Sequence, residues 1–166
     1  MTLAKILKEK ANNKIALLEQ NNLKDKKLPL WLIRLKKDLI NDVLIYALKI
    51  LPANFILDFE ENKFGENSNI SYNFDKSTNS WYDFIVCDDC EDNMNEILKL
   101  WIVPIIFSKH HISSILQEFN AWKNEWNAFI FDNNAICDIY YAIIRYLENY
   151  KFPYDNKALV KNVLDI

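Results

Sequence analysis

The chain has 166 residues, of which 51% are hydrophobic, and its formal net charge is −3. This length and composition are typical of one domain, here spanning 1–166, with enough apolar residues for a substantial core. The only glycine is Gly65, and only two of the 20 basic residues are arginines. Scarce glycine counts against loops that cradle phosphates or dinucleotides. A net acidic chain with few arginines is not expected to bind nucleic acid.

The sequence predicts two long helices at the N-terminus. In the first, over 3–20, the apolar residues follow the spacing of one helix face: Ala4, Leu7, Ala11, Ile15 and Leu18. The second is expected over 30–51, because Pro29 is tolerated in a first helical turn and Pro52 would end the helix. Its predicted buried stripe comprises Leu32, Leu35, Leu39, Val43, Tyr46 and Ile50.

The middle of the chain is expected to form short strands, and helices return after it. Apolar and β-branched residues predict strands at 55–59, 70–74 and 81–87. Further helices are predicted at 93–103, 109–128, 136–150 and 157–164, with 129–131 as a linker or strand. Together these elements predict a predominantly helical α+β domain, with about five to six helices around a small central sheet of two to three strands.

The sequence also predicts a cytoplasmic protein. Lys5 interrupts the N-terminal segment before an apolar core can form, so no signal peptide is expected. The longest apolar run, 100–107, is far shorter than the ~20 residues needed to cross a bilayer. The odd number of cysteines argues against a fully paired disulfide framework and favours a reducing compartment.

Charge is distributed unevenly, and this pattern suggests a binding surface. Residues 1–40 contain ten basic and four acidic residues, whereas 41–100 contain four basic and twelve acidic ones. The acidic excess peaks at Asp88, Asp89, Glu91 and Asp92, with Glu96 close behind. Clustered carboxylates accelerate encounter with a basic partner, so this cluster is the strongest candidate for a binding site.

Neither a metal site nor a catalytic site is expected. Cys87 and Cys90 have the spacing of a redox or zinc motif, but the surrounding carboxylates would oppose thiolate formation. His110 and His111 are adjacent, so usually only one of them could join the cysteines at a zinc ion. A zinc site made of the two cysteines and one histidine stays open. Glu118 follows His111 by about two helical turns, ~10 Å, which is too far for a direct hydrogen bond.

A last motif lies on the helix predicted at 136–150, where Asp138, Ile139, Tyr140 and Tyr141 are consecutive. This tetrad is similar to an acidic and aromatic stretch of the immunity proteins of nuclease bacteriocins. Small size, a composition typical of AT-rich genes and the acidic run also resemble bacterial toxin-immunity proteins. The chain is longer than those small helical proteins.

The resemblance implies a cytoplasmic inhibitor that binds and neutralises the basic domain of a cognate toxin, with no catalytic activity and no cofactor. The residues that would bind the toxin are Asp88, Asp89, Glu91, Asp92, Glu96, Asp138, Tyr140 and Tyr141. Two alternatives remain open. One is a structural or regulatory protein-interaction domain, which could self-associate. The other is a small hydrolase or nuclease that uses His110 or His111. Neither nucleic acid nor a membrane is expected as a binding partner of the inhibitor.

Overall fold

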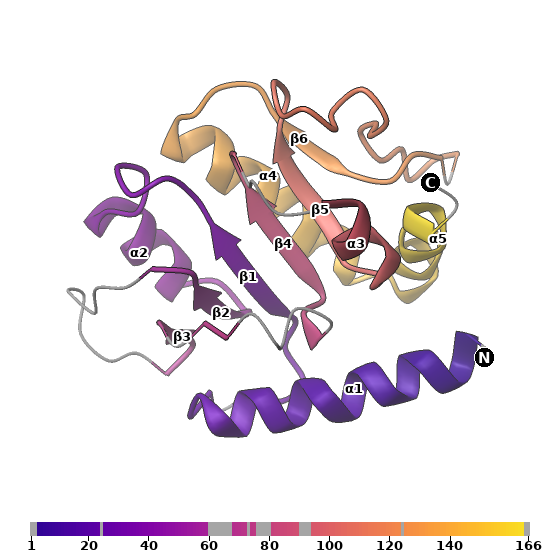
Figure 1. Ribbon diagram of the computed structural model, residues 1–166, viewed down its shortest axis with the longest axis horizontal. Coiled ribbons are helices and arrows are strands. Elements are labelled where there is room, and N and C mark those ends of the chain that lie inside the picture. Colours follow the sequence, from indigo (N-terminus) through magenta and orange to yellow (C-terminus); the bar gives the residue numbers. More distant parts are fainter. Residues whose placement is uncertain are drawn as a thin grey trace.

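A six-stranded sheet forms the centre of the protein, as shown by a computed structural model (Figure 1). The structure describes residues 3–23, 25–59, 68–72, 74–75, 81–89, 94–123 and 125–164. All neighbouring strands are parallel, and their order is β3-β2-β1-β4-β5-β6. The strands are β1 (Leu30–Arg34), β2 (Asn54–Leu57), β3 (Ile70–Ser71), β4 (Phe84–Cys87), β5 (Val103–Phe107) and β6 (Phe129–Phe131).

Helices cover the sheet on both faces. They are α1 (Leu3–Gln20), α2 (Asp42–Lys49), α3 (Met94–Lys99), α4 (Ile136–Tyr150) and α5 (Pro153–Leu164). In Figure 1, α2 and α4 lie behind the sheet and α3 lies in front of it, while α5 contacts α3, α4 and β5. A parallel sheet with this strand order and helices on both faces is a doubly wound, Rossmann-type α/β fold. The prediction of a mainly helical α+β domain with a small sheet is therefore wrong.

The largest error concerns the helix predicted at 30–51. Residues 30–34 form β1 instead, and a shorter helix, α2, follows it. A strand in the middle of a parallel sheet is buried on both faces, so it shows a continuous apolar run that periodicity alone cannot distinguish from a helix. In α2 the predicted stripe also faces the wrong way, because Val43, Tyr46 and Ile50 are 65%, 71% and 66% exposed.

The predicted helices at 93–103 and 109–128 also differ from the structure. The first ends at Lys99, and the apolar residues after it belong to β5, which includes Pro104. The described parts of the segment 108–128, which are 108–123 and 125–128, contain turns and isolated bridges rather than a helix. Its apolar residues Ile112, Leu116 and Phe119 are nevertheless buried, as their spacing indicated. The helices predicted at 3–20 and 136–150 are confirmed, and strands occur within or beside the three predicted strand segments.

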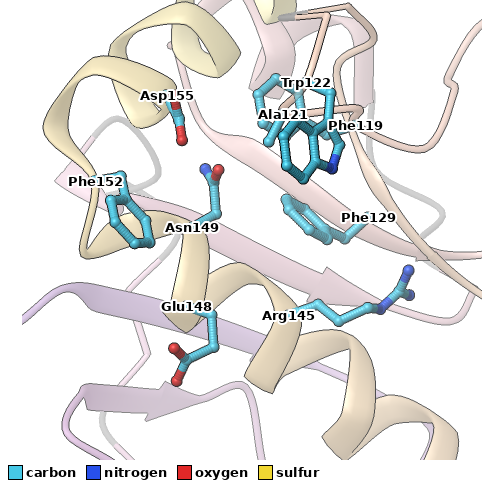
Figure 2. Close-up of a pocket in the computed structure, with 9 residues that line it drawn as sticks. All are labelled: Phe119, Ala121, Trp122, Phe129, Arg145, Glu148, Asn149, Phe152 and Asp155. Carbon is cyan, nitrogen blue, oxygen red and sulfur yellow. The ribbon is translucent and has the colours of Figure 1, made fainter.

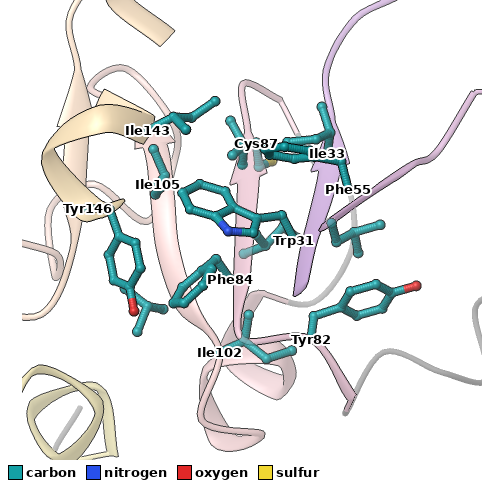
Figure 3. Close-up of a cluster of buried hydrophobic side chains, with 14 of the residues drawn as sticks. Trp31, Ile33, Phe55, Tyr82, Phe84, Cys87, Ile102, Ile105, Ile143 and Tyr146 are labelled. Carbon is teal, nitrogen blue, oxygen red and sulfur yellow. The ribbon is translucent and has the colours of Figure 1, made fainter. Parts of the chain in front are cut away.

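Trp31 lies at the centre of the core and joins the sheet to α4 (Figure 3). Its ring centroid lies 4.7 Å from that of Phe84, 5.5 Å from Tyr146 and 5.8 Å from Phe55. These four side chains come from β1, β4, α4 and β2, and all are fully buried. The aromatic residues that the sequence offers therefore pack mainly around the two central strands.

Helix α1 crosses the edge of the sheet at which the strands begin (Figure 1). Lys14 Nζ lies 2.9 Å from the Asp83 carboxylate, which also accepts a hydrogen bond from the Leu30 amide at 2.8 Å. Lys10 Nζ donates to the Trp101 carbonyl at 2.7 Å. Asp83, Leu30 and Trp101 all lie at or just before the start of a strand, so these contacts fasten α1 to that edge. The opposite edge, where the strands end, stays clear of α1.

Candidate functional site

The edge at which the strands end contains a topological switch point between β1 and β4. From β1 the chain continues to β2 on one side, whereas β4 leads to β5 on the other side. Connections that leave in opposite directions open a crevice, and open α/β sheets bind their ligands in this crevice. In this protein residues 35–37 follow β1 and Asp88 and Asp89 follow β4, so these two loops flank the switch point.

Two basic side chains follow β1 at this switch point. Lys36 and Lys37 are exposed, and Lys36 Nζ lies 3.1 Å from the Asp89 carboxylate. The hydrogen bond that Lys36 donates to Asp89, and then the charge of Asp89, raise the pKa of Lys36 above its ordinary value. Lys37 Nζ lies 5.8 Å from the ring centroid of Phe59. Two exposed ammonium groups therefore follow β1 at the switch point, and the contact of Lys36 with Asp89 is an ion pair at the surface.

Arg34, unlike Lys36 and Lys37, is the last residue of β1 and contacts side chains that follow β2 and β3. Its Nε lies 2.9 Å from the carboxylate of Asp58, which directly follows β2. Its guanidinium carbon lies 5.3 Å from the ring centroid of Phe74. The ion pair holds the ends of β1 and β2 together, whereas Lys36 and Lys37 are exposed.

Asp88 is a buried carboxylate directly after β4, with only 3% of its surface exposed. Its Oδ1 accepts a hydrogen bond of 3.1 Å from the Lys36 amide, whereas its Oδ2 is buried and has no hydrogen-bond partner in the described part of the chain. Burial raises the pKa of Asp88, while backbone hydrogen bonds and the Lys36 charge act against this rise. Asp88 thus fixes the loop that carries Lys36 and Lys37.

The acidic cluster predicted from the sequence is only partly described. Asp89 is exposed beside Asp88, and Glu96 is exposed on α3. Cys90, Glu91 and Asp92 lie outside the described residues.

The other predicted binding residues, Asp138, Tyr140 and Tyr141, lie on α4. Asp138 accepts a hydrogen bond of 2.6 Å from Asn133, and Tyr141 is 63% exposed. The predicted residues thus come from three separate elements. Their role in binding stays a prediction.

The histidines and cysteines do not form a metal centre within the described ranges. Cys87 is fully buried at the end of β4. His110 is buried after β5, where its Nδ1 accepts the Ile112 amide at 3.3 Å, and its ring lies 4.3 Å from that of His111. The sequence predicted that a helix begins near these two histidines, but the structure has a turn there. Across the described residues, no three or more His, Cys, Asp or Glu side chains are grouped so that they could hold a metal ion.

Sequence reasoning missed a cavity of about 480 Å³ between the segment 119–122, the start of β6 and the junction of α4 with α5 (Figure 2). Its aromatic lining consists of Phe119, Trp122, Phe129 and Phe152. The sequence favoured a core position for Trp122, whereas this side chain is 99% exposed. The signal available in the sequence was Asn149, a polar residue beside the buried stripe of the helix predicted at 136–150.

The fold is similar to that of the catalytic domain of starch synthase IV from Arabidopsis thaliana, whose structure has ADP and acarbose bound. The TM-score is 0.74, the sequence identity is 20%, and the match covers 95% of this chain. The chain spans about two fifths, 39%, of that catalytic-domain chain. No protein-family model matches the sequence, and no curated protein matches it.

This likeness overturns the functional predictions made from the sequence. The resemblance to toxin-immunity proteins is wrong, because the parallel α/β fold is similar to that of the starch synthase IV catalytic domain and not to a toxin-immunity fold. The predictions of a non-enzymatic inhibitor and of a basic toxin domain as its partner rested on that resemblance and are wrong with it. The likeness also gives no support to an interaction domain or to a histidine-dependent hydrolase.

Within the described ranges, none of the helices combines the length and the apolar character that spanning a bilayer requires.

Proposed function

We propose that this chain is a sugar-nucleotide-binding domain of a glycosyl-transfer enzyme, with the nucleoside diphosphate of the donor held in the crevice between β1 and β4. The observation that carries the proposal is the switch point itself, where the exposed Lys36 and Lys37 follow β1 and the buried Asp88 follows β4. The similarity to a catalytic domain that binds ADP supports it.

The residues present favour a particular way of holding a diphosphate. The loop after β1 lacks glycine, so its backbone is not suited to cradle phosphates closely. At the start of α2, the Asn41 side chain already accepts the Val43 and Leu44 amides at 3.1 and 3.2 Å. The phosphates would therefore be bound by lysine side chains. Lys36 can exchange Asp89 for a phosphate at low cost, because an ion pair between exposed side chains contributes little to stability in water.

Isothermal titration calorimetry with ADP, UDP and GDP tests this assignment. We expect at least one of the three to bind the wild-type protein, and the double variant Lys36→Ala/Lys37→Ala to bind it about tenfold or more weakly, a loss of about 1.4 kcal/mol. Affinity should also fall as salt is added, because the contacts are charge pairs at the surface.

The matched control is Lys157→Ala/Lys161→Ala, which removes the same charge from exposed positions on α5. This control should bind the nucleotide as the wild type does. If none of the three nucleotides binds at millimolar concentration, or if both double variants lose affinity equally, the crevice is not the nucleotide site. Release of the nucleoside diphosphate from a sugar nucleotide in the presence of acceptor glycans then tests glycosyl transfer itself.

A further inference from the structure

The cavity beside β6 is separate from the crevice between β1 and β4. Phe129 is the first residue of β6, so the cavity lies near the end at which this strand begins, whereas the crevice lies where the strands end. The other walls come from the last turns of α4 and the first turn of α5. A volume of about 480 Å³ lies within the range of ~300–1,000 Å³ that is usual for small-molecule sites.

Two of the charged groups at the cavity are already paired. The Arg145 guanidinium binds the Glu118 carboxylate and donates to the Ile130 carbonyl at 2.6 Å. Glu148 forms an ion pair of 2.6 Å with Lys151. The Arg145 charge is thus already compensated by Glu118, although its Nε is buried without a hydrogen-bond partner among the described residues, and the site does not favour an anionic ligand.

The remaining polar groups are matched to a ligand that both donates and accepts hydrogen bonds. Asn149 is 8% exposed, and its Nδ2 is buried without a hydrogen-bond partner among the described residues. A buried donor of this kind gains from a ligand acceptor. Asp155, also in the lining, has no ion pair or hydrogen bond within the described ranges and can accept from a ligand hydroxyl. A cationic ligand would supply only donors and would leave Asn149 unpaired.

Aromatic rings stand on either side of these polar groups. In Figure 2, Phe152 lies on one side and Phe119 with Trp122 on the other, and the Asn149 amide points into the space between them. Phe152 is 59% exposed and Trp122 is 99% exposed, so both rings are available to a ligand. A sugar ring has an apolar C–H face that packs on an aromatic ring and hydroxyl groups that both donate and accept hydrogen bonds.

We propose that this cavity is a saccharide-binding site for a neutral mono- or disaccharide. The sugar packs against Trp122 and Phe152, while Asn149 donates to one of its hydroxyl oxygens and Asp155 accepts from a hydroxyl group. This site does not depend on the proposed nucleotide site, because the two share no residue.

Saturation-transfer difference NMR on the full chain tests the proposal with glucose, galactose, mannose, N-acetylglucosamine and maltose as probes. We expect at least one of them to bind at millimolar concentration and to bind Trp122→Ala about tenfold or more weakly. Trp122 is almost fully exposed, so its truncation should leave folding intact. Asn149→Asp replaces the donor with an acceptor, so it should also weaken binding.

Tyr46→Ala is the matched control, because it removes an aromatic ring that is 71% exposed on α2 and does not line the cavity. Sugar binding should be unchanged in this variant and in Lys36→Ala/Lys37→Ala, which separates this site from the nucleotide site. The proposal is overturned if none of the five sugars binds, if Trp122→Ala binds as the wild type does, or if choline binds at the cavity while the sugars do not.

Discussion

Asp88 places an ionisable carboxylate inside the protein, and this has a consequence for stability. Burial raises its pKa, so the folded state holds the proton more tightly than the unfolded chain does. The stabilising contribution of this group is therefore complete below the unfolded pKa, about 3.9, and is lost as the pH rises through the raised pKa of the folded state.

We expect Asp88→Asn to be more stable than the wild type at neutral pH, and the difference to vanish toward pH 4 and below. Asparagine retains an oxygen that can accept the Lys36 amide, but it carries no charge. Urea unfolding at several pH values measures the effect. A variant that is less stable at neutral pH would show that the Lys36 charge and the backbone amides outweigh the burial of the anion.

At the scale of elements, one of the lysines that fasten α1 to the sheet makes the stability of the protein depend on pH. Burial lowers the pKa of the half-buried Lys10 from 10.5 to about 8. Between these two values the unfolded chain binds more protons than the folded protein, so stability should rise with pH from about 8 to 10.5.

Lys10→Met should remove this rise, whereas Lys8→Met, on an exposed position of the same helix, should retain it. Denaturant unfolding at pH values from 7 to 11 separates the two. An equal rise in all three proteins would assign the pH dependence to groups other than Lys10.

The elements also show what the sequence could and could not predict. Helices α1 and α4 were found because each has apolar residues at helical spacing. β1 was missed because both of its faces are buried and no alternation remains. In 108–123 and 125–128, the spacing of the apolar residues identified which side chains are buried, but it did not predict the backbone, which forms turns and includes Trp126 at φ 76°.

The candidate sites follow the same logic. Asp88 and Asp89 could be predicted as site residues because a run of carboxylates directly follows an apolar segment. Lys36 could not be connected with them, because only the pairing of β1 with β4 brings the two loops together. The cavity beside β6 combines residues from three segments whose arrangement depends on the tertiary fold.

At the scale of the whole molecule, stability depends strongly on the aromatic cluster around Trp31. This side chain contacts rings from β2, β4 and α4, and none of its surface is exposed. We expect Trp31→Ala to lower the free energy of unfolding by about 3–5 kcal/mol, as is usual for a large aromatic residue in a core. This is a large part of the ~5–15 kcal/mol that stabilises a typical domain.

Trp122→Ala provides the comparison, because this tryptophan is 99% exposed and its removal should change stability by less than about 0.5 kcal/mol. Guanidinium unfolding followed by circular dichroism measures both variants. Similar losses of stability in the two would mean that the cluster around Trp31 does not dominate the core.

The junction between β1 and β4 also bears on the speed of folding. Leu30 and the Asp83 carboxylate that binds its amide are 53 residues apart in the chain, with β2 and β3 between them. The two central strands can therefore pair only after a long loop has closed, and its entropic cost precedes the gain from the contacts. We expect this pairing to form late and to limit the folding rate, so that the half-sheet of β1, β2 and β3 exposes an unpaired central strand until β4 arrives. Until β4 pairs with it, the unpaired edge of β1 would then be the part of the nascent chain most prone to aggregation.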